Sequence, residues 1–245
     1  MFNFFVDKEK ENDRYQIIGS DYNHIKNVLR MKEGEKLIVS NNGKSDLCEI
    51  EGFNDSEVLV KVIEENYNDT SLPVKIVLMQ GLPKSDKMEL IIQKTVELGV
   101  DKIIPVETSR SIVKIENKKK DGKTARWQAI AESAGKQSKR NYIPEISPIL
   151  TFKEAIERAK EFDLFIVPYE CKSGMTATKE TLSKIKKDMT VGIFIGPEGG
   201  FSEEEISKAE SVGAKVISLG KRILRTETAA MTAVAMIMLY AEMNI

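Results

Sequence analysis

The stretch Gly196-Pro-Glu-Gly-Gly200-Phe-Ser202 decides the fold class of this chain, together with Leu219-Gly-Lys-Arg-Ile-Leu-Arg225-Thr-Glu-Thr-Ala229. Each follows an apolar run typical of a buried strand, at 191–195 and 215–218, and each leads into a predicted helix. Two such turns at neighbouring positions of a parallel sheet form a cleft at its carboxyl edge, where α/β proteins bind ligands. Their glycines allow a ligand to approach the backbone closely.

The region around these turns, from residue 73 onward, alternates strand patterns with helical ones. This alternation predicts an α/β fold with a parallel sheet covered on both faces. Strands are expected over 75–80, 102–106, 164–168, 191–195 and 215–218, and helices over 85–98, 124–137, 153–161, 178–187, 202–212 and 227–242. The last helix is apolar nearly all round, so we expect it to be buried in the core or against a second subunit.

Local signals define the ends of two of these helices. Ser85 is the candidate N-cap of the helix over 85–98, and Gly99 is expected to end it. The apolar face of that helix is predicted to consist of Met88, Ile91, Ile92, Thr95 and Val96. Ser202 with Glu205 matches a capping box at the start of a later helix.

Residues 1–65 have the strand-and-turn pattern of a small β-barrel. Strands are expected over 1–6, 36–39, 47–53 and 57–62, with one short helix through residues 24–29. Asn41-Asn-Gly43 predicts a tight hairpin, because both of its central residues tolerate positive φ. Residues 65–73 have linker composition, so we expect two domains, over 1–70 and 73–245.

Composition excludes several classes of protein and site. The chain of 245 residues has a net charge of −1, so no strong field of one sign points to a nucleic-acid partner. Cys48 and Cys171 are far apart, which argues against a disulfide framework or a cysteine zinc site and favours a reducing cytoplasm. His24 is the single histidine, so we expect no histidine-ligated metal. Residues 1–7 lack the pattern of a signal peptide, and 229–240 is too short to span a bilayer.

The glycine turns do not match the common nucleotide-binding fingerprints. Residues 81–87 follow a strand but lack the spacing of a P-loop, and no G-x-G-x-x-G follows the first strand of the α/β region. Glu198 would repel a phosphate cluster. The turn that contains it therefore suits a cationic or hydroxyl-bearing ligand better.

The second turn enters its helix through Arg225-Thr-Glu-Thr228. Thr226 or Thr228 is expected to cap the helix, and Glu227 is favoured there by the helix dipole. Arg225 opposes that dipole, so we expect a ligand or Glu227 to fix its position.

Basic side chains gather between residues 118 and 140, around Trp127. They are Lys118, Lys119, Lys120, Lys123, Arg126, Lys136, Lys139 and Arg140, and the surface could be extended by Arg30, Lys32, Lys84 and Lys87. Such a face would contact nucleic acid through phosphates, but a solvated helix and loop explains the charges equally well.

The assembled motifs resemble the RsmE family of 16S ribosomal RNA uridine-N3 methyltransferases, within the SPOUT superfamily of knotted methyltransferases. The resemblance extends over nearly the whole chain, and its last two motifs are highly specific together. The motifs that carry it are HIKNVLRM (24–31), GLPKSDKMELIIQKTVELGV (81–100), TSRSIVK (108–114), Arg126-Trp127 with residues 134–140, GPEGGFSEE (196–204) and LGKRILRTETA (219–229). Ser85 and the segment 131–137 depart from the residues usual in the family, away from both turns.

The resemblance implies an α/β, SPOUT-type parallel sheet with a C-terminal trefoil knot, preceded by a small PUA-like β-barrel that binds RNA. It also implies a homodimer with the active site at or near the subunit interface. S-adenosyl-L-methionine is the implied cofactor, and 16S rRNA of the small ribosomal subunit is the implied partner. The implied cofactor-binding residues are Gly196, Pro197, Glu198, Gly199, Gly200, Leu219, Gly220, Ile223 and Leu224. The expected RNA-binding residues are Arg30, Lys84, Arg110, Arg126, Lys136, Lys139 and Arg140.

Methyl transfer from a sulfonium to uracil N3 requires the site to remove the N3 proton or to stabilise the anion it leaves. We expect Arg225 to stabilise negative charge on the uracil carbonyl oxygens or to anchor a phosphate. Glu198 or Glu227 is expected to accept the proton or to orient Arg225. Two alternatives stay open: ribose 2′-O-methylation by the same type of fold, and an RNA-binding assembly factor without enzymatic activity.

Overall fold

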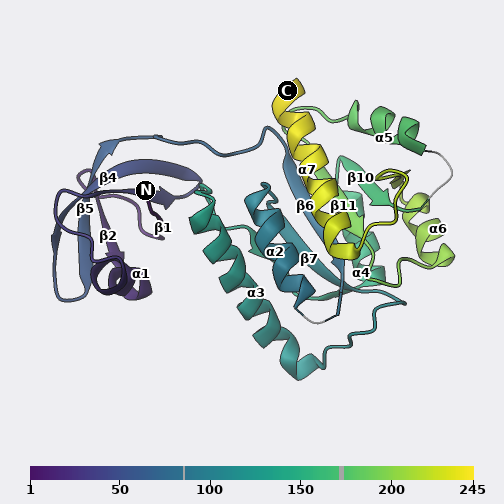
Figure 1. Ribbon diagram of the computed structural model, residues 1–245, viewed down its shortest axis with the longest axis horizontal. Helices are drawn as coiled ribbons and strands as arrows, with labels where there is room; N and C mark the ends of the chain where they lie inside the picture. The colour runs from purple at the N-terminus through teal and green to yellow at the C-terminus, as the bar shows by residue number, and fades with distance from the viewer. Residues whose placement is uncertain (85, 171–173) are drawn as a thin grey trace. The chain divides into compact units, whose positions relative to one another are not determined.

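The computed structural model describes residues 1–84, 86–170 and 174–245, which form two compact units (Figure 1). Unit 1 consists of Met1–Ser71 and Gly135–Ile143, and unit 2 consists of Leu72–Ala134 and Pro144–Ile245. The long helix α3 (Asn117–Gln137) therefore belongs to both units. The sequence predicts two consecutive domains, over 1–70 and 73–245. It gives no sign that the chain returns to unit 1 at Gly135, because this boundary lies inside a helix and has no linker composition.

Unit 1 is a curled β half-barrel (Figure 1). Its sheet has the order β1-β3-β4-β5-β2, in which β1 runs parallel to β3 and the other neighbours are antiparallel. The strands are β1 (Asn3–Phe5), β2 (Arg14–Ile18), β3 (Lys36–Asn41), β4 (Lys44–Phe53) and β5 (Glu57–Glu64). The Asn-Gly hairpin is confirmed: Asn41 pairs with Lys44, and Asn42 and Gly43 have φ of 47° and 80°.

One helical segment, α1 (Gly19–Asn23) and η1 (His24–Val28), follows β2 in unit 1. It carries Tyr22 and Ile25 into the core formed by the inner face of the sheet. Strand β2 is absent from the sequence-based expectation, although the turn at Asn12-Asp13, with φ of 51° and 59°, directly precedes it.

The sheet of unit 2 is parallel and has the order β12-β10-β11-β6-β7-β8, with β9 beside β7. Its strands are β6 (Lys75–Gly81), β7 (Lys102–Glu107), β8 (Glu145–Ile146), β9 (Leu150–Thr151), β10 (Leu164–Pro168), β11 (Thr190–Ile195) and β12 (Lys215–Ile217). All five predicted strands are present. The two glycine turns do not follow adjacent strands, however, because β10 lies between β11 and β12. The carboxyl end of β10 therefore lies between the two glycine turns at the edge of the sheet.

Helices cover both faces of this sheet, as predicted (Figure 1). One face packs against α2 (Lys87–Glu97), α3 and α7 (Thr226–Asn244), the other against α4 (Phe152–Arg158) and α6 (Glu203–Ser211), while α5 (Gly174–Leu182) contacts β12. The buried residues of α2 are the five predicted ones, and Gly99 follows the helix with φ of +99°. Ser85, the expected cap, and Cys171 lie outside the described residues.

Helix α7 packs on α2, β6 and β11 at the centre of unit 2. Its buried face consists of Thr226, Ala230, Ala233, Val234, Ile237 and Ala241. Leu239 and Met243, on another side, are 48% and 73% exposed. The core therefore accounts for only part of this apolar helix. Within the described ranges, none of the helices combines the length and apolar character needed to cross a membrane.

Candidate functional site

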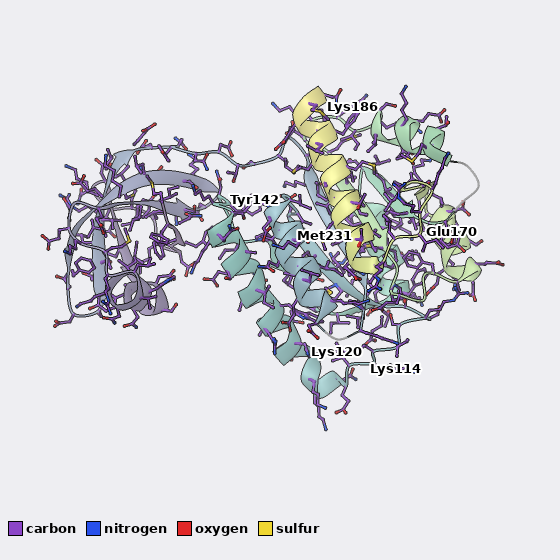
Figure 2. All side chains as sticks on the ribbon, viewed as in Figure 1. Lys114, Lys120, Tyr142, Glu170, Lys186 and Met231 are labelled. Atoms are coloured by element: carbon purple, nitrogen blue, oxygen red, sulfur yellow. The ribbon has the colours of Figure 1, made fainter. Side chains whose placement is uncertain are left out.

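A cavity of about 630 Å³ lies at the carboxyl edge of the sheet in unit 2. Its walls come from the ends of β10 and β11, from the segment 218–226, and from Lys87 and Arg110. Glu170, labelled in Figure 2, marks the contribution of the segment after β10. The volume lies within the range of about 300–1,000 Å³ that is usual for small-molecule sites. The cleft predicted between the two glycine turns is thus present, with β10 as an additional wall.

The turn after β11 is closed by a hydrogen bond from Gly200 N to Pro197 O of 2.9 Å. Gly200 has φ of +64°, which favours glycine. A Cβ added at Gly196 would lie 3.2 Å from the Gly200 backbone, so a larger residue there would require the turn to shift. Ser202 and Glu205 then form the predicted capping box of α6.

The turn after β12 is held by the Ser218 hydroxyl and by α5. Ser218 Oγ accepts a hydrogen bond of 3.1 Å from Gly220 N, and Gly220 has φ of +114°. Thr178 Oγ1 donates to Ser218 O at 2.7 Å. Beyond this point Ile223 is 82% exposed, and with Leu224 it lines the cavity. The segment therefore presents the apolar side chains of Ile223 and Leu224 to the cavity.

Thr226 links three of the elements that border the cavity. Its Oγ1 donates to Gly196 O at 2.6 Å and accepts from Gln80 Nε2 at 3.0 Å. The expectation that Thr226 or Thr228 caps α7 is wrong, because Arg225 occupies the N-cap position without a side-chain cap bond. The Thr226 hydroxyl instead ties the start of α7 to the ends of β6 and β11.

Lys87, at the start of α2, is paired with two carboxylates of the site. Its Nζ lies 3.0 Å from Glu198 Oε1 and 3.4 Å from Glu227 Oε2. The backbone N–H of Lys84 donates to both oxygens of Glu198, at 3.1 and 3.3 Å. The hydrogen bond to Glu198 raises the pKa of Lys87. Burial by itself would raise the pKa of the Glu198 carboxyl, but the hydrogen bonds from Lys87 and the backbone hold that pKa below its ordinary value.

The structure brings together most of the predicted site residues. The cavity is lined by Gly196, Pro197, Glu198, Gly199, Gly200, Leu219, Gly220, Ile223, Leu224 and Arg225. Glu227 is not among the described residues that line the cavity, and it reaches the site through Lys87. Arg110, expected to bind RNA, also lines the cavity, where its Nη1 donates to Gly199 O at 3.2 Å.

The basic residues expected to bind RNA divide between the two units. Arg30, Lys136, Lys139 and Arg140 belong to unit 1, and Lys84, Arg110 and Arg126 belong to unit 2. Lys136 pairs with Asp21 at 2.8 Å, and Arg126 pairs with Glu89 at 2.9 Å. The exposed ones are Arg30, Lys84, Arg110, Arg126 and Lys139.

Arg140 is the exception among these basic residues. It is 3% exposed, and its guanidinium carbon lies 4.7 Å from the centre of the Tyr142 ring. The guanidinium therefore packs inside the protein, and contact of Arg140 with RNA stays a prediction. Trp127 is likewise a core residue of unit 2.

Sequence reasoning did not place Lys87, Tyr169, Glu170 or Ser218 in this site, although all of them line the cavity. From the sequence, Lys87 is expected only as a possible extension of the basic surface around residues 118–140. The sequence contains one indication that Lys87 belongs to the site: it follows a glycine turn at the carboxyl end of a buried strand. For Tyr169 and Glu170 the strand order was needed, which the sequence alone does not show.

Comparisons with known proteins agree on one family. Residues 70–238 match the RNA methyltransferase domain, and residues 17–63 match the RNA methyltransferase PUA domain. A Bacillus subtilis protein named ribosomal RNA small subunit methyltransferase E is 37% identical over 251 residues, which cover 99% of this chain and 98% of that protein.

Solved structures similar to this chain include two with a bound cofactor. A ribosomal RNA small subunit methyltransferase E from Neisseria gonorrhoeae, bound to S-adenosyl methionine, is 30% identical with a TM-score of 0.82, covering 98% of this chain and 97% of that one. A methyltransferase from Legionella pneumophila in complex with the cofactor SAM is 32% identical with a TM-score of 0.83, covering 97% of this chain and 96% of that one.

Proposed function

Because the chain belongs to the RNA methyltransferase family that includes the enzymes named ribosomal RNA small subunit methyltransferase E, we propose that it transfers a methyl group from S-adenosylmethionine to N3 of a uridine in 16S ribosomal RNA. One observation carries this proposal. A single cavity brings both glycine turns and Arg225 to the carboxyl edge of the sheet. The proposed place of action is the cytoplasm.

The residues of the cavity fit S-adenosylmethionine. Gly196 and Gly220 lie in turns whose backbone groups can bind the edges of adenine and ribose, while Ile223 and Leu224 offer apolar contact to a flat ring. Glu198 supplies a negative charge that suits the positive sulfonium better than a phosphate. When bound, this cofactor supplies an electrophilic methyl carbon.

Methyl transfer to N3 requires the protein to stabilise negative charge that develops on the uracil as the N3 proton leaves. An electron pair of N3 forms the new C–N bond, the C–S bond breaks with its electrons returning to sulfur, and the N3 proton leaves. We assign stabilisation of the negative charge on the uracil carbonyl oxygens to Arg225, which is exposed and lines the cavity. The bidentate guanidinium can contact an oxygen beside N3 without itself taking the proton.

The two candidate carboxylates have different positions. Glu198 lines the cavity, so it is the one that we propose to accept the N3 proton or to pass it to solvent. Glu227 contacts Lys87 and acts on the site through that lysine. Glu198→Gln is therefore expected to lower methyl transfer more than Glu227→Gln, and equal losses in single-turnover assays would contradict the assignment.

The test of the function is methyl transfer to small ribosomal subunits that lack the modification. Purified protein, labelled S-adenosylmethionine and such subunits are incubated, and the digested RNA is analysed by mass spectrometry. Label on N3 of uridine is the expected result. Label on a ribose 2′-oxygen would replace the proposed reaction with a different one, and RNA binding without label would indicate an assembly factor.

Two structural features implied by the family complete the proposal. We propose that the segment 218–225 passes through a loop of unit 2 to form a trefoil knot. The position of α7 supports this, since the chain returns from the edge strand β12 to the centre of the sheet. An experimental structure that traces this segment without threading would contradict it.

We also propose a homodimer that covers the outer side of α7. Met231, Ala235, Leu239 and Met243 repeat at helical spacing along that side, and Met231 is labelled in Figure 2. Leu239 and Met243 are exposed and Met231 and Ala235 are half-buried, and an apolar stripe of this kind is typical of an interface. Sedimentation should show a dimer, and Leu239→Lys should shift it toward the monomer.

A further inference from the structure

Lys87 occupies a position that helix stability does not explain. It is the first residue of α2, where a cation opposes the helix dipole. Its Nζ contacts Glu198, in the turn after β11, and Glu227, in the first turn of α7. The side chain of Lys87 therefore joins three separate elements at one wall of the cavity.

Lys87 forms an ion pair with both carboxylates, while Glu198 also accepts hydrogen bonds from the backbone N–H of Lys84. Both carboxylates lie within 3.4 Å of the same nitrogen, so they lie close to each other. Within residues 1–84, 86–170 and 174–245, neither Glu198 nor Glu227 has a second ion-pair partner. Without Lys87 this wall would carry two adjacent negative charges in place of one.

Charge at this wall acts differently on the two forms of the proposed cofactor. S-adenosylmethionine carries a positive sulfonium, whereas its product S-adenosylhomocysteine carries a neutral sulfur. An added negative charge nearby attracts the first and leaves the second nearly unaffected. It would also stabilise the reacting cation more than the transition state, in which the charge on sulfur is already falling.

We propose that Lys87 is a specificity-determining residue, which neutralises one carboxylate at the cavity wall and so limits the preference of the site for S-adenosylmethionine over S-adenosylhomocysteine. The inference rests on the proposed function, since it concerns the same cavity. It predicts that loss of the lysine charge strengthens binding of the donor relative to binding of the product. A purely structural role predicts that both ligands weaken by the same factor.

The experiment compares the Kd of both ligands by calorimetry at low ionic strength. Lys87→Met is expected to lower the ratio of the Kd for S-adenosylmethionine to the Kd for S-adenosylhomocysteine by about three- to tenfold. Lys87→Arg should keep the wild-type ratio. Lys94→Met is the matched control, because it removes the same charge from the same helix, where Lys94 pairs with Glu97.

A second variant keeps the test decisive if Lys87→Met does not fold. Glu227→Gln removes one negative charge, and the ratio should then rise above the wild-type value. An unchanged ratio in Lys87→Met, or an equal change in Lys94→Met, would overturn the inference while leaving the proposed function intact. A wild-type protein that binds neither ligand would instead contradict the proposed function, and the inference with it.

Discussion

Arg225 is the residue on which the proposed chemistry depends most directly. It occupies the N-cap position of α7, makes no cap bond there and lines the cavity. If its guanidinium stabilises charge that develops on the uracil, Arg225→Ala should lower kcat by about 10²–10³. The Kd for S-adenosylmethionine should stay within about twofold of the wild-type value, because the lost contact is to the base. Single-turnover methyl transfer and calorimetry measure the two quantities.

Arg158→Ala is a suitable control for that prediction. Arg158 is an exposed arginine of α4 that pairs with Glu161, away from the residues that line the cavity. Its removal should leave both quantities unchanged. Normal turnover by Arg225→Ala with intact cofactor binding would show that Arg225 is not needed for the chemical step.

For individual residues, the sequence predicts the backbone turns better than it predicts which side chains form ion pairs. The glycine turns are recognisable in the sequence because each follows a buried strand pattern, and Gly200 and Gly220 have the positive φ that favours glycine. Glu198 and Glu227 were expected near Arg225, but the structure pairs both with Lys87. Such a pairing depends on how three elements pack, and no spacing along the chain encodes it.

Among the elements, β6 lies in close contact with Pro197, in the turn after β11 that lines the cavity. A Cβ at Gly81 would lie 2.7 Å from Pro197 Cδ and 2.8 Å from Pro197 N. Gly81→Ala must therefore push two backbones apart, which should lower the free energy of unfolding by about 1–3 kcal/mol and weaken cofactor binding. Urea denaturation and calorimetry measure the two effects.

Gly122→Ala provides the opposite case. Gly122 lies inside α3, and nothing would lie within 4 Å of its added Cβ. This variant should be stabilised by about 0.5–1 kcal/mol, because alanine favours the helix. Similar stabilities for Gly81→Ala and Gly122→Ala would mean that the β6 contact does not constrain the turn.

The elements themselves were largely predictable, and their order in the sheet was not. Alternating patterns located the five longer strands and the buried face of α2, since each depends on local periodicity. The place of β10 between β11 and β12 depends on long-range pairing. The short strands β8 and β9 have two residues each, too few for a pattern to be recognised.

For the whole molecule, the distribution of basic residues over both units predicts how RNA is bound. Arg30 and Lys139 are exposed in unit 1, whereas the cofactor cavity lies in unit 2. We propose that both units contact the substrate RNA, the first through phosphates. The double variant Arg30→Ala with Lys139→Ala should then weaken RNA binding without changing the Kd for S-adenosylmethionine.

The salt dependence of RNA binding shows whether Arg30 and Lys139 contact phosphates. Each phosphate contact that is lost should lower the slope of log K against log salt by about 1, so the double variant should lose about 2. Lys8→Ala with Lys61→Ala is the control, because it removes the same charge from exposed positions of unit 1. Equal losses in the two double variants would mean that general charge attracts the RNA. A wild-type slope in the Arg30 and Lys139 variant would show that these two side chains do not contact phosphates of the RNA.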